Sequence, residues 1–229
     1  MEVDTLMAEL ESLGTEQNRK IYRRHGASDD VFGVSFADFK VLAKRIKTDQ
    51  ALAEALWQTG NSDARSLATM IADPKTMTAA DLDRWIEDVD DVRQYGLSDL
   101  ISRNIAGQSP LARELAERWM ATDREYVEMA GWDTLAILAM KDQSLPDSYF
   151  EGYLDTIESR IHDSKNRVRH AMNGALIAIG MRSAALRERA NAVAKVIGKV
   201  VVDHGQTGCK TPDATSYIAK AWARKKVAV

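Results

Sequence analysis

The feature that most constrains this chain is a repeated pattern of helix pairs, each marked by a tryptophan. Trp57, Trp85 and Trp119 each end a predicted helix, at intervals of 28 and 34 residues. Eleven residues after each tryptophan, the next helix has a small residue, and these residues are Ala68, Gly96 and Ala130. Small residues let stacked helices approach closely, so the period predicts helical hairpins stacked into a right-handed solenoid. A non-repetitive helical bundle is the alternative.

Helix-forming residues dominate the whole chain. Only 4 prolines occur among 229 residues and, apart from residues 199–202, no stretch alternates as a strand would. Apolar periodicity places helices at 3–13, 15–25, 35–46, 49–58, 62–72, 78–88, 92–105, 110–121, 124–140, 147–162, 165–181, 183–199 and 212–225. The residues expected to cap helix starts are Thr48, Thr78, Ser109 and Ser164. We predict an all-α superhelix of helical-hairpin repeats, one domain over residues 1–229, in which residues 200–229 form a C-terminal loop and a capping helix.

Charge is distributed very unevenly along the chain. Residues 160–229 contain 14 Lys and Arg against 4 Asp and Glu, whereas residues 1–159 contain 17 against 30, although the net charge is only −3. A strongly positive segment attracts polyanions, and such asymmetry indicates a nucleic acid or a membrane as partner. No apolar run reaches the ~20 residues of a membrane span. We therefore expect DNA, and no membrane, as the partner.

The segment RIHDSKNRVRHAMNGALIAIG, residues 160–180, places much of this charge on one predicted helix. Its apolar residues recur at helical spacing and form a face for burial, while another face has amide and basic groups. The side chains predicted to contact DNA from this helix are Lys165, Asn166, Arg167, Arg169, His170 and Asn173. Arg103, Lys44 and Arg45 are further predicted contacts. A solvated basic helix is the alternative interpretation.

Cysteine and histidine usage excludes several classes of site. Cys209 is the only cysteine, so no disulfide framework exists, and 4 scattered His residues have no metal-ligand spacing. The sequence also lacks a Gly-rich phosphate loop and the usual short catalytic motifs. We therefore expect a cytoplasmic monomer that uses no metal and no cofactor.

Four stretches of the chain match one known family in order and spacing. They are FGVSFADFKVLAKRIK (32–47), LAEALWQTGNSDARSLATMIAD (52–73), the region from RQYGLSDLI to RWMATD (93–123) and SKNRVRHAMNGALIAIG (164–180). They resemble the AlkD-like DNA alkylation repair family, whose members consist of HEAT-like repeats. The resemblance covers residues 15–200 and implies a basic concave groove for duplex DNA. Active members of that family hydrolyse the glycosidic bond of cationic N3- or N7-alkylated purines.

Within this resemblance, Tyr95 and Asp99 occupy the place of the family's catalytic aromatic-x-x-x-Asp pair. Breaking an N-glycosidic bond develops positive charge on the sugar, and a nearby carboxylate stabilises that charge. An aromatic ring four residues earlier lies on the same helix face and can contact the sugar or a cationic base. The alternative is an ordinary ion pair between Asp99 and Arg103, which are also four residues apart.

The chain departs from the glycosylases of that family at three positions. The glycosylases have Trp in place of Tyr95, Arg in place of Met129 and a second Trp in place of Ala175. The resemblance therefore implies a reduced aromatic cage for a cationic base. Trp132 and Asp133, on the next inner helix, are an alternative site, and a core tryptophan with a surface aspartate is the other interpretation of these two residues.

The segment VVVDHGQTGCKTPDATSYIAKAW, residues 200–222, is similar to non-classical branches of the same family. His204, Cys209 and Lys210 would fit a nucleophilic site. The glycines and the Thr-Pro pair in this segment instead favour a loop that leads into a terminal helix.

Two functions fit these observations. The first is excision of cationic alkylpurines, with Asp99 as the electrostatic catalyst and Tyr95 against the sugar. The second is non-catalytic binding of damaged or branched DNA through Arg and Lys side chains. A protein–protein scaffold is a third class, but it leaves the basic segment at 160–226 unexplained.

Overall fold

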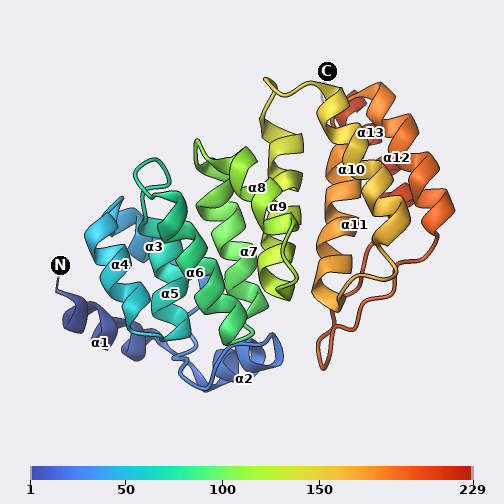
Figure 1. Cartoon of the computed structure of the whole chain (residues 1–229). Helices are drawn as coiled ribbons and strands as arrows, with labels where there is room; N and C mark the ends of the chain where they lie inside the picture. The colour runs from blue at the N-terminus through green and yellow to red at the C-terminus, as the bar shows by residue number, and fades with distance from the viewer. Residues whose placement is uncertain (1, 228–229) are drawn as a thin grey trace. The chain divides into compact units, whose positions relative to one another are not determined.

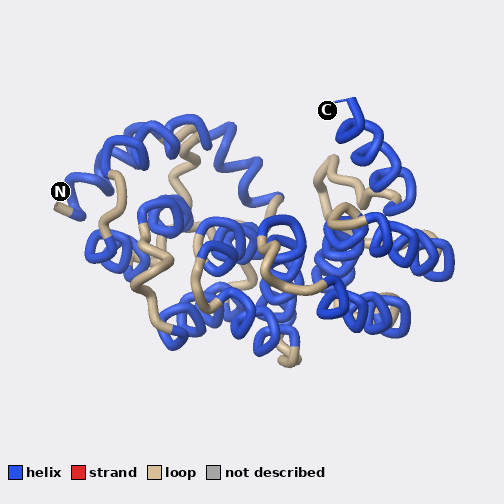
Figure 2. Tube along the Cα trace, turned by 90° about the horizontal axis from the view of Figure 1, so that it is seen from above, coloured by secondary structure: helices blue, strands red, loops and turns tan. Residues whose placement is uncertain are grey.

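The computed structural model describes residues 2–227, which form helices joined by loops and contain no strand (Figures 1 and 2). Residues 199–202, the one candidate strand, therefore form none. The chain divides into two compact units. Unit 1 extends to Leu111 and includes Gly205–Thr207, and unit 2 comprises Ala112–His204 and the residues from Gly208 onward. The all-α fold is confirmed, whereas the single domain over residues 1–229 stays a prediction.

Unit 1 centres on α5, which packs against α1, α3, α4 and α7 (Figure 1). Its elements in the described residues are α1 (Val3–Leu13), α2 (Glu16–Arg24), α3 (Phe36–Ile46), α4 (Gln50–Gln58), α5 (Ser62–Ile71), α6 (Ala79–Asp91), α7 (Tyr95–Asn104) and the 3₁₀ turn η1 (Ala106–Gln108). Helix α7 also packs against α6. Helices α5 and α7 are therefore in a position to present side chains to the same interior space.

Unit 2 centres on α9 and α11, which pack against each other. Its helices are α8 (Ala112–Met120), α9 (Glu125–Lys141), α10 (Asp147–Arg160), α11 (Asn166–Gly180), α12 (Ala184–Ile197) and α13 (Ala214–Val227). Every predicted helix is present, with bounds within about three residues of those expected. Within the described residues, none of the helices has the length and apolar character needed to cross a membrane.

Side chains at two helix starts in unit 1 satisfy backbone N–H groups that lack helical partners. Thr78 caps α6 as predicted, in a reciprocal pair with Asp81. At α4 the cap is Asp49 rather than Thr48, because the Asp49 carboxylate accepts the backbone N–H of Leu52 at 3.0 Å. The helix thus begins one residue later than expected.

The two remaining cap predictions, at Ser109 and Ser164, are wrong. Ser164 donates to the carbonyl oxygen of Arg160, and Lys165 takes the N-cap position of α11 without a side-chain cap. Ser109 precedes a turn, and α8 begins only at Ala112. The serine hydroxyls bond locally in both places, which is a common competitor of helix capping.

Two of the repeated tryptophans join α4 to α6. Trp57 and Trp85 are fully buried, and their rings stack with centroids 4.0 Å apart and an interplanar angle of 4°. Trp57 Nε1 donates to Asp88 of α6 at 2.8 Å, and Trp85 Nε1 donates to Glu54 of α4 at 3.1 Å. The pair buries two large apolar surfaces while both indole N–H groups keep a partner. The tryptophan repeat therefore fixes one helical hairpin against the next.

The close approach of two helices in unit 2 depends on a glycine beside the predicted small residue. A Cβ on Gly131 would lie 2.6 Å from Met120 N and 3.0 Å from Ala116 O, both on α8. Ala130 is fully buried. Gly96, in contrast, is exposed, and a Cβ there would meet nothing within 4 Å. The predicted spacing role of Gly96 is therefore wrong.

Replacing Gly131 with alanine should lower the free energy of unfolding by about 1–3 kcal/mol, because the added methyl group overlaps backbone atoms of α8. Gly152→Ala is the matched control: Gly152 is exposed within α10, and a Cβ there would meet nothing within 4 Å. This control should be neutral or stabilising by about 0.5–1 kcal/mol. Denaturant unfolding measures both variants, and equal stabilities would contradict the proposed contact.

Candidate nucleic-acid interface

One buried carboxylate holds the connection between α2 and α3. Asp63, in the first turn of α5, is 2% exposed and accepts the backbone N–H groups of Phe32, Gly33 and Val34 at 2.5, 3.0 and 2.9 Å. Burial raises the pKa of Asp63, and the three N–H groups act in the opposite direction because they stabilise the carboxylate. The connection is thereby fixed to α5.

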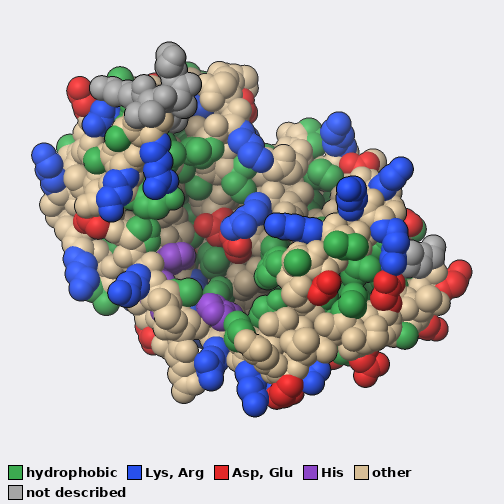
Figure 3. Space-filling model, turned by 180° about the vertical axis from the view of Figure 1, so that it is seen from behind, with side chains coloured by type: hydrophobic (Ala, Val, Ile, Leu, Met, Phe, Trp, Pro, Cys, Tyr) green, Lys and Arg blue, Asp and Glu red, His purple; other side chains and the backbone are tan. Residues whose placement is uncertain are grey.

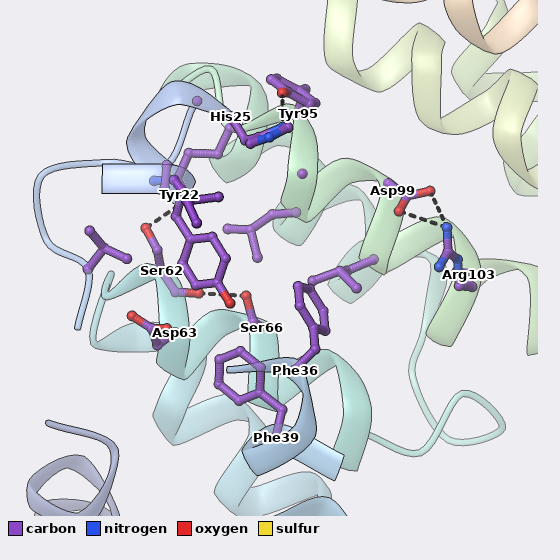
Figure 4. Close-up of a pocket in the computed structure, with 18 residues that line it drawn as sticks. Tyr22, His25, Phe36, Phe39, Ser62, Asp63, Ser66, Tyr95, Asp99 and Arg103 are labelled. Carbon is purple, nitrogen blue, oxygen red and sulfur yellow. Dashed lines mark hydrogen bonds and ion pairs between the residues drawn. The ribbon is translucent and has the colours of Figure 1, made fainter. Parts of the chain in front are cut away.

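This connection closes one side of a cavity of about 350 Å³ within unit 1 (Figure 4). Aromatic side chains of α2 and α3 form one wall, α5 contributes hydroxyl groups, and α7 contributes the opposite wall. The lining includes Tyr22, His25, Phe36, Ser62, Tyr95 and Asp99. The volume lies in the range of roughly 300–1,000 Å³ that is usual for ligand sites.

Tyr95 is the first residue of α7 and contacts the residues that follow α2. Its hydroxyl oxygen lies 3.0 Å from His25 Nδ1. Gly26 has φ +81°, and a Cβ there would lie 3.1 Å from the Tyr95 ring. Glycine therefore suits both the backbone conformation and the close approach of the ring. Tyr95 is held at the edge of the cavity by these contacts (Figure 4).

Asp99 lines the same cavity one helical turn later. Arg103 Nη2 donates to both carboxylate oxygens of Asp99 at 3.0 and 3.1 Å, and the side chains of Arg103 and Asp99 remain 65% and 43% exposed, respectively. In Figure 4 this pair lies apart from the aromatic side chains. The ion pair expected as an alternative is thus present, and Tyr95, Asp99 and Arg103 all border one cavity. The catalytic role of Tyr95 and Asp99 stays a prediction.

The alternative site lies in unit 2, on α9. Trp132 is 1% exposed and its ring meets that of Tyr153 edge to face, with centroids 6.0 Å apart. Met129 and Ala175, the positions aligned with the family's Arg and Trp, are buried as well. These side chains contribute to the core of unit 2. A site at Trp132 and Asp133 stays a prediction.

Sequence reasoning missed a buried carboxyl group one turn before Trp132. Glu128 is 5% exposed, and burial raises its pKa, while the Arg160 guanidinium at 3.4 Å acts against that rise. The spacing of four residues between Glu128 and Trp132 was the available sequence signal. The aromatic lining from Tyr22 and Phe36 was missed too, because nothing in the sequence pairs α2 with α3.

The polar face of α11 holds the C-terminal segment in place. Three residues of α11 that were predicted to contact DNA form hydrogen bonds with this segment. They are Asn166, Arg169 and Asn173, which donate to the carbonyl oxygens of Asp203, Val201 and Pro212 at 2.8, 3.1 and 3.1 Å. Asn166 Oδ1 also accepts the Asp203 N–H at 2.7 Å, and Asn173 is 1% exposed. Their roles toward DNA stay predictions.

The start of α11 is more open to a ligand. Lys165 Nζ lies 2.7 Å from an Asp123 carboxylate oxygen, and the two side chains are 44% and 100% exposed. The hydrogen bond from Lys165 lowers the pKa of Asp123. Such an exposed pair contributes little stability, so Lys165 can exchange the carboxylate for a phosphate. The backbone N–H of Arg167 donates to Glu125 at 2.8 Å.

Histidines connect α11 to the loop before α13. The rings of His170 and His204 meet edge to face, with centroids 5.5 Å apart, and His204 Nε2 lies 2.9 Å from Thr211 Oγ1. Cys209 and Lys210 are exposed in the same loop. These contacts explain His204 as part of the loop structure, and a nucleophilic role for the loop stays a prediction.

The predicted contacts on α3 differ in their surroundings. Arg45 donates through Nη1 and Nη2 to the two oxygens of Glu9 at 2.8 and 2.5 Å, and this hydrogen bonding lowers the pKa of Glu9. Lys44 is exposed. On the face shown in Figure 3, basic side chains are interspersed with acidic and hydrophobic ones. The described part of the chain has no cluster of three or more His, Cys, Asp or Glu residues that could hold a metal ion.

Paired helices stacked by small residues and buried tryptophans define this chain as an all-α protein of HEAT-like repeats. The family described as DNA alkylation repair enzyme matches residues 6–218. An uncharacterized protein of Listeria monocytogenes is 31% identical over 230 residues, which cover 97% of this chain and 98% of that protein. An uncharacterized protein of Listeria innocua is 31% identical over 225 residues, covering 95% and 96%. The chain belongs to the DNA alkylation repair enzyme family.

A solved structure has the same fold. It is described as belonging to a new family of proteins related to the HEAT-like repeat DNA glycosylases with affinity for branched DNA structures. The TM-score is 0.85 at 35% identity, and the match covers 98% of this chain and 95% of that chain. The HEAT-like repeat fold expected from the resemblance is therefore confirmed.

Changing Asp63 to asparagine should destabilise the protein by about 1–3 kcal/mol. The amide has one accepting oxygen, and its NH₂ group would face backbone N–H donors that are then left without an acceptor. Asp29→Asn removes the same charge from an exposed position in the same connection and should have little effect. Chemical denaturation decides between them, and an Asp63→Asn protein as stable as the wild type would refute the anchoring role.

Asn166→Ala should loosen the C-terminal segment without unfolding unit 2, since it removes two hydrogen bonds to Asp203. We expect trypsin to cleave after Lys199 or Lys210 severalfold faster than in the wild type. Gln206→Ala changes an exposed amide of the same segment and serves as the control. Unchanged cleavage in Asn166→Ala would mean that other contacts hold the segment.

Proposed function

We propose that this protein binds branched DNA without excising bases. Its membership of the DNA alkylation repair enzyme family supports this proposal, as does the solved relative with affinity for branched DNA structures, which is similar over nearly the whole chain. Binding of a branch point requires shape recognition and phosphate contacts rather than chemistry on a base. The basic segment at 160–226 supplies the charge for such contacts.

The proposal depends mainly on Asp99, the one carboxylate that matches the catalytic residue of the family's glycosylases, and on its ion pair. Both oxygens of Asp99 receive the Arg103 guanidinium, so its charge is already compensated. An electrostatic catalyst must instead direct its charge at the sugar as positive charge develops there. The positions aligned with the family's Arg and second Trp hold Met129 and Ala175, which are buried and cannot replace those side chains. This arrangement favours binding over excision.

The phosphate contacts are assigned to three cations of α3 and of the start of α11. Lys165 forms an exposed ion pair, and Lys44 is exposed on α3. Arg167, in the first turn of α11, is the third candidate. Arg45 and Arg169 bond carboxylate or carbonyl oxygens of their own chain and are weaker candidates. Binding through such contacts depends steeply on salt concentration.

We expect the protein to bind a three-way DNA junction about tenfold more tightly than a linear duplex of the same length. The double variant Lys165→Ala/Arg167→Ala should weaken binding to both DNAs. It should also reduce the slope of log K against log salt by about 1 for each phosphate that the variant no longer neutralises. Lys195→Ala removes an exposed charge from α12 and is the control. Fluorescence anisotropy titrations measure these affinities, and the absence of binding at low salt would overturn the proposal.

Excision of cationic alkylpurines is the second candidate, because Tyr95 and Asp99 line the same cavity. A cationic base leaves as a neutral molecule, so a modest site could suffice. Stabilisation by one carboxylate is worth on the order of 10²–10³ in rate. One measurement, the release of methylated bases from DNA, distinguishes the two candidate functions.

Wild-type protein in excess should release no 7-methylguanine or 3-methyladenine from methylated duplex DNA above the rate without protein. Arg103→Ala, which removes the partner of Asp99, should be equally inactive. Release by the wild type that falls by about 10²–10³ in Asp99→Asn would establish excision instead. Equal release by the wild type and Asp99→Asn would direct attention to Asp133.

A further inference from the structure

Besides the ion pair at its edge, the cavity of unit 1 has aromatic and polar side chains that could bind a ligand. We propose that it receives one unpaired nucleobase of the bound DNA, while the phosphates of that nucleotide remain outside on a basic rim. This inference rests on the proposed binding of branched DNA, because branch points offer bases that are not stacked in a duplex.

The aromatic wall presents a ring to the opening. Phe36 is 49% exposed although it lines the cavity, and Ile21 beside it is 39% exposed. Phe36 meets Tyr22 and Phe39 edge to face, with centroids 6.3 and 5.7 Å apart, so its orientation is fixed from two sides. An exposed, held aromatic ring is the platform on which proteins stack single bases.

Polar groups deeper in the cavity can bond the edge of a base. Ser62 Oγ donates to Gln94 Oε1 at 3.2 Å and lies 2.9 Å from Ser28 Oγ. Gln94 is 3% exposed and lines the cavity, and its amide offers a donor and an acceptor to a ligand. A few polar groups in a pocket with aromatic rings are typical of sites that hold a flipped base.

The rim carries the charge that a nucleotide requires. Arg24 directly precedes the lining residue His25, and Arg93 directly precedes the lining residue Gln94, so each of two elements has a cation next to the lining in the sequence. Both are exposed, and neither forms an ion pair in the described part of the chain. The N-terminus of α7 begins at Tyr95 and adds partial positive charge. Arg103 compensates the negative charge of Asp99, which would otherwise repel phosphate.

The fixed connection explains why the cavity persists without a ligand. Asp63 holds residues 32–34 to α5, and Tyr22 donates its hydroxyl to the Val34 carbonyl oxygen at 2.6 Å. The ring of Tyr22 cannot then rotate into the space beside Phe36 without breaking this bond. A preformed pocket reduces the ordering cost of binding.

The test uses the full-length protein and a three-way junction with one unpaired 2-aminopurine at the branch point. Stacking on Phe36 should quench its fluorescence severalfold when the protein saturates the junction. A second junction has an abasic site in place of the unpaired base, and we expect about tenfold weaker binding to it, as the absence of one stacked base implies.

Variants locate the effect in the cavity. Phe36→Ala should remove most of the preference for the junction with a base, whereas Val41→Ala should keep it. Val41 is 66% exposed on the same helix and does not line the cavity, which makes it the matched control. Gly96→Leu is a second variant: a Cβ at Gly96 meets nothing within 4 Å, and the larger side chain should fill the opening without disturbing the fold.

The outcomes separate this inference from the proposed function. Tight junction binding with unchanged 2-aminopurine fluorescence and equal affinity for the abasic junction would overturn the cavity assignment and leave branched-DNA binding intact. Failure to bind either junction at low salt would overturn both. Disappearance of the base preference in Phe36→Ala and Gly96→Leu, with circular dichroism unchanged, would support the assignment.

Discussion

The site in unit 1 depends on the buried carboxylate of Asp63. Three consecutive backbone N–H groups of the α2–α3 connection donate to it. These residues are not helical, so their N–H groups need an acceptor outside a helix. This fixed connection sets the position of Tyr22 and the start of α3, and with them the aromatic wall of the cavity. Gly26 then lets the connection approach Tyr95 of α7. The carboxylate of α5 thus fixes a connection that lies 29–31 residues earlier in the chain.

The structure separates the cations that hold the fold together from those to which the proposed DNA contacts are assigned. Arg182 is an example: its guanidinium is 5% exposed and bonds Asp147 and the carbonyl oxygens of Ala139, Asp142 and Leu145. Arg182 therefore ties helices together and is not available for the proposed phosphate contacts. Arg169 and Arg45 are similarly bonded to their own chain. Fewer cations are therefore available to a ligand than the excess of Lys and Arg in the C-terminal part of the sequence indicates.

The helices could be predicted from sequence because apolar spacing and few prolines dictate them locally. Tryptophan spacing also predicted real packing, since Trp57 and Trp85 stack between hairpins. The choice of Gly131 over Gly96 as the contact glycine could not be predicted, because both follow one of the repeated tryptophans at similar spacing. At the candidate site, Tyr95 and Asp99 were predicted through the family resemblance, which rests on an aromatic-x-x-x-Asp pair within one helix. The wall at Phe36 was not, because it depends on the irregular connection that Asp63 holds.

Binding of branched DNA at the cavity of unit 1 can be tested by hydrogen exchange of the full-length protein, with and without a three-way junction. A linear duplex of equal length is the comparison. We expect slower exchange in residues 20–36 and at the start of α7 with the junction and not with the duplex. Protection that is identical for both DNAs, or that leaves these residues unchanged while other helices are protected, would contradict binding at the cavity.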